Sequence, residues 1–96
     1  MNDILFVWDK RKATINERKH GISFEEAQTV FYDEHSIEFF DPGHAEDEDR
    51  FIMLGLSFKL RILIVCYCVK EDTAIRIISA RKATRHEAKS YQGDRT

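Results

Sequence analysis

The chain has 96 residues, of which 43% are hydrophobic and 33% charged, and its formal net charge is −2. A chain of this length buries a core without help from disulfides or metals, so we expect a single domain over residues 1–96. The longest apolar run, residues 62–69, is far shorter than the roughly 20 residues that cross a bilayer. The apolar run 4–8 precedes its basic cluster, which is the reverse of a signal peptide, and we expect a cytoplasmic protein.

Charge is segregated along the sequence. Residues 21–49 contain many acids and neither lysine nor arginine, whereas residues 1–20 and 50–96 are both net basic. If the fold brings the two basic segments together, one surface is suited to hold a polyanion while the rest keeps the protein soluble. The alternative is that these charges scatter over the whole surface.

Two helices are predicted early in the chain. Residues 4–8 are typical of a short strand, and Asp9 is a suitable N-cap for a helix that ends at Gly21. That helix is polar on almost every side, with Ala13 and Ile15 as its apolar anchors, so most of it should be solvated. One stripe of the helix carries, at helical spacing, Lys12, Asn16 and Lys19.

The second helix follows directly. Ser23 and Glu26 have the spacing of a capping box, so a helix should begin at residue 24. Its apolar side chains recur at helical spacing and indicate a face that packs in the core. These core residues are Phe24, Ala27, Val30 and Phe31.

The segment after the second helix reads as a strand, "SIEFF", and an acidic loop, "DPGHAEDED". The loop contains His44 and several carboxylates, which raises the question of a divalent-ion site. Its spacing does not fit an EF-hand, which needs alternating ligands and a distal glutamate. We favour a solvated loop.

Three longer strands are predicted over residues 50–57, 61–69 and 74–81, and the short connections between them favour antiparallel hairpins. The middle strand is apolar at nearly every position, which places it at the centre of the sheet. Its two cysteines, Cys66 and Cys68, share one face at a separation that is poor for a disulfide, so we expect buried free thiols.

A last helix should begin at the capping box of Thr84 and Glu87 and run to about Gln92. It is weakly apolar apart from Ala88 and Tyr91. The two early helices can cover one face of the sheet, but this short helix is the only cover for the other. An under-covered apolar face predicts a groove or a partner.

Cations gather around the last strand, "IRIISARK". Strict alternation places Arg81 on one face of this strand and Arg76 and Lys82 on the other, while Arg61 begins the neighbouring strand. Arginine binds phosphate in a bidentate manner, and metal-independent RNA cleavage needs a base, cations to stabilise the phosphorane, and an acid. A surface salt bridge is the alternative for each arginine. Candidates to move protons are Glu87, Tyr91, His20 and His86.

The blocks "FVWD", "KHGISFEEAQTVF" and "IRIISARKAT", in this order and spacing, closely resemble the BrnT family of toxins from bacterial type II toxin–antitoxin systems. The resemblance covers about residues 6–91. It implies an α+β, RelE-like fold with a mainly antiparallel sheet, two N-terminal helices and one C-terminal helix, in the order β-α-α-β-β-β-β-α or close to it. It also implies an endoribonuclease that cleaves RNA and blocks translation and growth. From the chemistry of the residues we expect this cleavage to need no cofactor or metal.

The resemblance further implies a partner, a BrnA-type antitoxin of the ribbon-helix-helix class. The expected assembly is a heterotetramer of two toxins and two antitoxins. The antitoxin neutralises the toxin, and the complex represses their shared operon through operator DNA. No membrane association is expected.

The matching residues define the expected site. For catalysis we expect Arg81, Lys82, Arg61, Arg76, Glu87 and Tyr91, and for RNA binding Arg50, Lys19, His20 and Lys12. The general base remains open. Trp8 and Gly21 are expected to be structural, and the hairpin "SFKLR" lacks the glycine expected before Arg61, which predicts a longer or strained turn. The alternative functions are a non-catalytic nucleic-acid-binding module and a protein-interaction domain.

Overall fold

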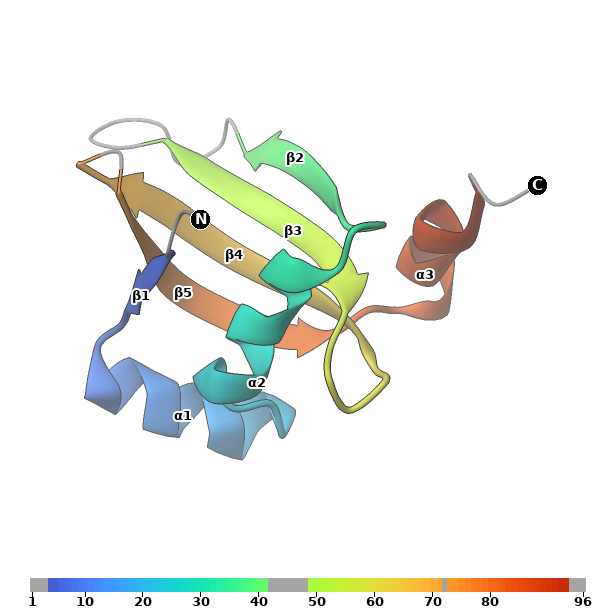
Figure 1. Cartoon of the computed structure of the whole chain (residues 1–96). Coiled ribbons are helices and arrows are strands. Elements are labelled where there is room, and N and C mark those ends of the chain that lie inside the picture. The colour runs from blue at the N-terminus through green and yellow to red at the C-terminus, as the bar shows by residue number, and fades with distance from the viewer. Residues whose placement is uncertain (1–3, 42–48, 72, 94–96) are drawn as a thin grey trace.

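The computed structural model describes residues 4–41, 49–71 and 73–93 (Figure 1). The acidic-loop interpretation, including that of His44, concerns residues that lie almost wholly outside these ranges. The described elements in chain order are β1 (Leu5–Val7), α1 (Lys10–His20), α2 (Phe24–Gln28), the 3-10 helix η1 (Thr29–Tyr32), β2 (Ile37–Asp41), β3 (Arg50–Leu56), β4 (Ile62–Lys70), β5 (Ala74–Lys82) and α3 (Arg85–Gly93).

The strands form a five-stranded sheet in the order β1-β5-β4-β3-β2. The pairings of β2 with β3, β3 with β4 and β4 with β5 are antiparallel. At the other edge, β1 runs parallel to β5, with Leu5 opposite Ala74 and Val7 opposite Arg76. The fold is therefore α+β with a mixed sheet, because the short strand β1 pairs with the last strand of the chain.

Helix α1 has the predicted ends. The Asp9 carboxylate accepts a hydrogen bond from the Lys12 amide at 3.0 Å, and Gly21 ends the helix with φ 73°, in the left-handed region that glycine favours. The prediction that Ile15 anchors this helix is wrong, because Ile15 is 54% exposed. Asn16 is the buried residue of this helix instead, so α1 is held to the sheet by a polar side chain.

Helix α2 begins at its predicted cap, where Ser23 Oγ accepts from the Glu26 amide at 3.0 Å. It is shorter than expected, because the chain tightens into η1 after Gln28. The predicted core face is confirmed for Phe24, Ala27 and Val30, which are fully buried, while Phe31 is partly buried against them. They pack in one cluster with residues of β4 and β5, namely Leu63, Val65, Ile77 and Ala80.

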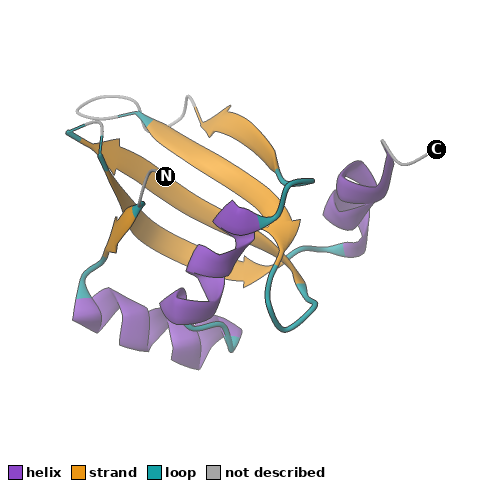
Figure 2. Ribbon diagram, in the orientation of Figure 1, coloured by secondary structure: helices purple, strands orange, loops and turns teal. Residues whose placement is uncertain are grey.

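The sheet has two faces of different character. Helices α1 and α2 lie on the same side of the sheet (Figure 2), and we call that side the helix-bearing face, defined by Leu63, Val65 and Ala80. We call the other side of the sheet the open face. It is defined by Leu54, Ile64 and Arg81, which lie opposite one another in the row adjacent to that of Leu63. Helix α3 stands beside one end of the sheet and does not lie across it (Figure 1).

A bulge in β5 changes the predicted alternation. Cys66 pairs with Ser79 while Tyr67 pairs with Ile77, so Ile78 is an extra residue in the strand. The expected grouping of Arg76 with Lys82 is therefore wrong. Arg76 pairs with Cys68 in the row of the open face, while Lys82 pairs with Leu63 of the core.

Two smaller predictions are confirmed. Cys66 and Cys68 are free as expected, and Cys68 is buried, whereas Cys66 is only partly buried; that burial raises the pKa of its thiol. The turn between β3 and β4 is strained as expected, because Leu60 adopts φ 64° where a glycine would be unstrained.

Candidate functional site

Arg81 and Glu87 form a bidentate ion pair at one end of the open face. Arg81 Nη1 donates to Glu87 Oε1 at 2.8 Å and Nη2 donates to Oε2 at 2.9 Å. The predicted capping box is complete, since the Glu87 amide donates to Thr84 Oγ1 and the Thr84 amide donates to Glu87 Oε1. Arg81 first, and then the Thr84 amide, lower the pKa of Glu87 to about 2. Glu87 is therefore a carboxylate at neutral pH.

This ion pair borders an apolar cavity. Arg81 lies opposite Ile64, which lies opposite Leu54, so the three side chains share one row of the sheet. The Arg81 and Glu87 side chains are 40% and 31% exposed, so a ligand can reach them. The cavity is lined by Phe39, Ile52, Leu54, Ile64, Arg81, Glu87 and Ser90.

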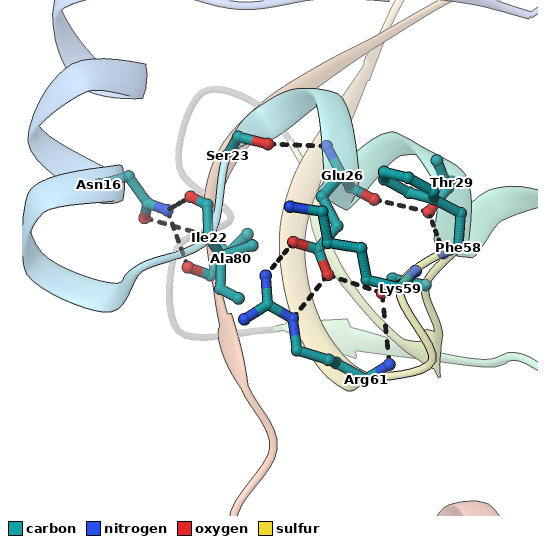
Figure 3. A network of polar contacts seen from close by, with 10 residues as sticks. Asn16, Ile22, Ser23, Glu26, Thr29, Phe58, Lys59, Arg61 and Ala80 are labelled. Carbon is teal, nitrogen blue, oxygen red and sulfur yellow. Dashed lines mark hydrogen bonds and ion pairs between the residues drawn. The ribbon is translucent and has the colours of Figure 1, made fainter.

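A second arginine–glutamate pair lies on the helix-bearing face (Figure 3). Glu26 is 1% exposed and accepts from Arg61 Nε at 2.9 Å and from Ser57 Oγ at 2.7 Å, while Arg61 Nη2 contacts its other oxygen. Burial alone would raise the pKa of Glu26, but the hydrogen bonds from Arg61 and Ser57 outweigh it and the pKa is lowered. Arg61 therefore neutralises a buried carboxylate.

The expected site cations do not gather in one pocket. Lys82 pairs with Leu63, on the same face as Arg61, which precedes Leu63 by two residues. Arg81 emerges on the opposite face, where it contacts Glu87. The sheet therefore separates Arg81 from Lys82 and Arg61, although all three lie toward the same end of the strands.

Three of the expected RNA-binding residues do come together. Lys12, Lys19 and His20 line a groove between α1 and β5, and Lys12 and Lys19 are exposed. Asn16 joins the two elements that form this groove, because its side chain bonds to β5. Its amide nitrogen donates to the Ile22 and Ala80 carbonyls at 3.0 and 2.8 Å, and its oxygen accepts from the Ala80 amide at 3.1 Å (Figure 3). Its floor includes Ile78 and Ser79 of the β5 bulge.

Arg50 and Arg76 lie at the far end of the open face. Both occupy the row of Cys68, with Arg50 on β3 and Arg76 on β5. One row of the open face, that of Cys66 and Ser79, lies between them and Arg81 on β5. They are thus near each other and away from the cavity that Arg81 borders.

Tyr91 is part of the packing. It is 5% exposed, and its hydroxyl donates to Asp33 Oδ2 at 2.6 Å, so it holds α3 against the end of η1. Burial would raise the pKa of Asp33, but hydrogen bonds from Tyr91 and the Leu56 amide lower it. His86, by contrast, is exposed on α3.

The structural roles of three polar residues were not predicted from the sequence: Asn16, Glu26 and Asp33. A signal existed for Glu26, which shares a helical face with Val30 and is therefore a polar residue on an apolar face, where burial requires a partner. Asn16 lies on a stripe with Lys12 and Lys19, which gave no sign of burial. Asp33 has one local partner, the His35 amide, but its other partners come from distant β3 and α3.

Within the described ranges, no three His, Cys, Asp or Glu side chains are grouped so as to hold a metal ion. The helices of the same part of the chain are all too short or too polar to cross a membrane.

Comparison with known proteins agrees with this architecture. The crystal structure of the Brucella abortus ribonuclease toxin BrnT superposes with a TM-score of 0.64 at 24% sequence identity, covering 86% of this chain and all of that one. At this identity the likeness concerns the fold. A search of curated proteins found no match.

A family model identifies the class. The model described as "Ribonuclease toxin, BrnT, of type II toxin-antitoxin system" matches residues 8–87, which include the Arg61–Glu26 and Arg81–Glu87 pairs. The match places the chain among the toxins of type II toxin–antitoxin systems. Within that class, the chain belongs to the BrnT family of ribonuclease toxins.

Proposed function

We propose that this protein is a RelE-like, metal-independent endoribonuclease that acts in the cytoplasm, cleaves RNA and thereby stops translation and growth. The observation that carries the proposal is the family match over residues 8–87. A BrnA-type antitoxin neutralises it in a complex of two toxins and two antitoxins, and this complex represses the shared operon. The separation of basic and acidic segments in the sequence supports a polyanionic substrate.

The proposed reaction is attack of a ribose 2′-oxygen on the adjacent phosphorus. A bond forms between the 2′-oxygen and phosphorus, and the bond from phosphorus to the next 5′-oxygen breaks. The products are a 2′,3′-cyclic phosphate and a 5′-hydroxyl. A base takes the 2′-hydroxyl proton and an acid returns a proton to the leaving 5′-oxygen.

Arg81 is the group we propose to stabilise the charged phosphorane. It is accessible at a cavity, and its planar fork is held by the two oxygens of Glu87, which gives it a fixed direction before substrate binds. Glu87, with a pKa of about 2, is the positioning residue for Arg81 and is too acidic to protonate the leaving oxygen. Tyr91 supports this arrangement by fixing α3.

The remaining cations are proposed to hold the RNA backbone. On the helix-bearing side these are Lys82, together with Lys12, Lys19 and His20 in the groove beside α1, whereas Arg61 is held by the buried Glu26 carboxylate. On the open face they are Arg50 and Arg76. Cations on both sides of the last strand suit an RNA strand that passes around the end of the sheet next to Arg81.

The test is cleavage of RNA by the purified protein in the presence of EDTA. We expect cleavage that persists in EDTA, ends in cyclic phosphate, and stops when the antitoxin is added. Loss of cleavage in EDTA would overturn metal independence, while leaving the ribonuclease assignment in place.

The two alternative functions are separated by Arg81→Ala. A ribonuclease loses cleavage while its fold is retained. A non-catalytic nucleic-acid-binding module shows no cleavage in the wild type and only weaker RNA binding in the variant. A protein-interaction domain shows neither cleavage nor RNA binding in either form.

A further inference from the structure

The tip of the hairpin between β3 and β4 exposes large apolar side chains. Phe58 is 65% exposed and Leu60 78% exposed, and Tyr32 on the neighbouring η1 is 67% exposed. Scattered apolar residues are common on surfaces, but a group of large ones marks an interaction site. None of these residues belongs to the cation sites described above.

The hairpin keeps this shape against a local conformational preference. Leu60 has φ 64°, a conformation that a glycine would adopt without strain, and its amide donates to the Ser57 carbonyl at 2.8 Å. Strain of this kind persists where the surroundings hold the chain in place, and it concentrates at binding sites.

Hydrogen bonds from the helical segment hold the tip in place. Thr29 Oγ1 accepts from the Phe58 amide at 2.9 Å and donates to the Glu26 carbonyl at 2.7 Å (Figure 3). Ser57 Oγ donates to the Glu26 carboxylate at 2.7 Å. The Phe58 ring is therefore presented by a backbone that is fixed before any ligand binds, which lowers the cost of binding.

Phe58 and Tyr32 line one cavity, together with Thr29, Asp33, Leu56 and Ser57. Two exposed aromatic rings bordering a cavity suit a flat, unsaturated ligand that stacks on them. The carboxylate of Asp33 accepts from the Leu56 amide, the His35 amide and the Tyr91 hydroxyl. A carboxylate offers about four acceptor positions, so one remains for an N–H donor of a ligand.

One cation adjoins the Phe58 ring. Lys59 Nζ lies 5.8 Å from the centre of that ring. An aromatic ring with an adjacent ammonium group is the usual composition of a surface that binds single-stranded nucleic acid.

We propose that Phe58 and Tyr32 form a stacking site for one nucleobase of single-stranded RNA, with Lys59 contacting the adjoining phosphate. This proposal rests on the proposed ribonuclease function, and it gives the hairpin the task of positioning the substrate. RNA is favoured over an apolar protein segment because the cavity combines aromatic rings with a carboxylate acceptor and an adjacent ammonium group.

Binding is tested without cleavage by using a single-stranded oligonucleotide of 2′-O-methyl nucleotides, which lacks the attacking hydroxyl. In Phe58→Trp, a base stacked on the indole should quench its fluorescence as oligonucleotide is added. The wild type, with its single tryptophan, gives the background signal of Trp8. Phe40→Trp is the matched control, since Phe40 is 52% exposed at the other end of the sheet, and it should show no added quenching.

Two substitutions separate stacking from simple apolar contact. Phe58→Leu keeps apolar bulk but removes the ring, and it should weaken oligonucleotide binding on the order of tenfold, whereas Phe58→Trp should bind at least as well as the wild type. Because Phe58 is largely exposed, both variants should retain the wild-type circular dichroism and thermal midpoint.

Equal binding by Phe58→Leu and the wild type, or equal quenching in Phe58→Trp and Phe40→Trp, would overturn the stacking site. If Phe58→Leu instead weakens only antitoxin binding, the hairpin is a protein contact. If the wild type cleaves RNA and Phe58→Leu cleaves it equally well, the stacking site is rejected and the ribonuclease function is kept. If Phe58→Trp is quenched but the wild type does not cleave RNA, the stacking site is kept and the ribonuclease function is rejected.

Discussion

The two arginine–glutamate pairs use the same sequence motif in opposite ways. Glu26 and Glu87 each stand three residues after a helix cap. Glu87 returns to the Thr84 amide and completes its capping box, whereas the side chain of Glu26 turns inward to Arg61 and Ser57. Glu26 is 1% exposed and the side chain of Glu87 is 31% exposed.

This difference separates a structural pair from a functional one. A buried carboxylate needs a permanent cation, so Arg61 cannot leave Glu26 without leaving a charge unpaired in the core. Arg81 is under no such constraint, because water reaches both side chains of its pair, and a guanidinium with five N–H donors can contact a phosphate while it stays paired with Glu87. The first pair therefore serves folding, and the second is suited to the substrate-binding role proposed for it.

The largest expected effect is on activity. Arg81→Ala should lower the rate of RNA cleavage by roughly 10²–10³-fold, as for the loss of one donor to a charged transition state. The free energy of unfolding should change by less than about 1 kcal/mol, because water reaches both side chains of the pair, which are 40% and 31% exposed. Cleavage assays and urea unfolding measure the two quantities.

Arg85→Ala is the control for that variant. Arg85 is exposed on α3, the helix that carries Glu87, and does not line the cavity of Arg81, so cleavage should be unchanged. Equal cleavage by Arg81→Ala and Arg85→Ala would show that Arg81 is not the phosphate-binding group.

Breaking the other pair should act on stability. Arg61→Ala leaves the Glu26 carboxylate buried without its cation and should lower the free energy of unfolding by roughly 2–3 kcal/mol. This is below the 3–5 kcal/mol typical of a fully buried pair, because the Arg61 side chain is 30% exposed and water can replace part of it. Urea unfolding measures the loss.

A second substitution identifies the cause of that loss. Adding Glu26→Gln to Arg61→Ala removes the unpaired charge and should recover part of the stability. If the double variant is less stable than Arg61→Ala alone, the buried charge is not what destabilises the single variant.

The helix caps allow a finer comparison. Ser23→Ala and Thr84→Ala should each lower the free energy of unfolding by about 1 kcal/mol. The Ser23 variant should lose more, because α2 packs in the core while α3 stands at the end of the sheet. Thermal and urea unfolding of both variants measure the difference, and a larger loss for Thr84→Ala would contradict the structural ranking.

The smallest effect is a dependence on pH. The folded pKa of Glu87 is about 2 and its ordinary value 4.5, so the pair stabilises the protein above about pH 4.5 and this contribution is lost as the pH falls toward 2. The contribution should be less than about 1 kcal/mol, because both side chains are well exposed. In Glu87→Gln, the free energy of unfolding should fall less steeply as the pH is lowered from 4.5 toward 2. An unchanged fall would show that Arg81 does not stabilise the Glu87 carboxylate.

Local patterns were enough to predict much of the fold. The caps Asp9, Ser23 and Thr84, and the helix stop at Gly21, act through neighbouring residues, so their signals lie within a few positions of one another. The central place of β4 also follows from its own composition. The partner of β1 could not be predicted, because its pairing with β5 depends on residues at the other end of the chain.

The site was harder to predict, since it depends on which face each side chain takes. One extra residue at Ile78 moved Arg76 to the face of Arg81, and periodicity cannot locate a bulge. The roles of Arg61 and Arg81 could not be separated by sequence, because both are arginines near strand ends. Only the burial of their partners Glu26 and Glu87 distinguishes them.

The parallel pairing of β1 with β5 has a consequence for synthesis. Leu5 is made well before its partner Ala74, and contacts so distant in sequence form late. The β1 edge of the sheet and the packing of α1 against β5 therefore form only after β5 has been synthesised. Until that point a growing chain has β1 and α1 but lacks the strand on which both of them pack.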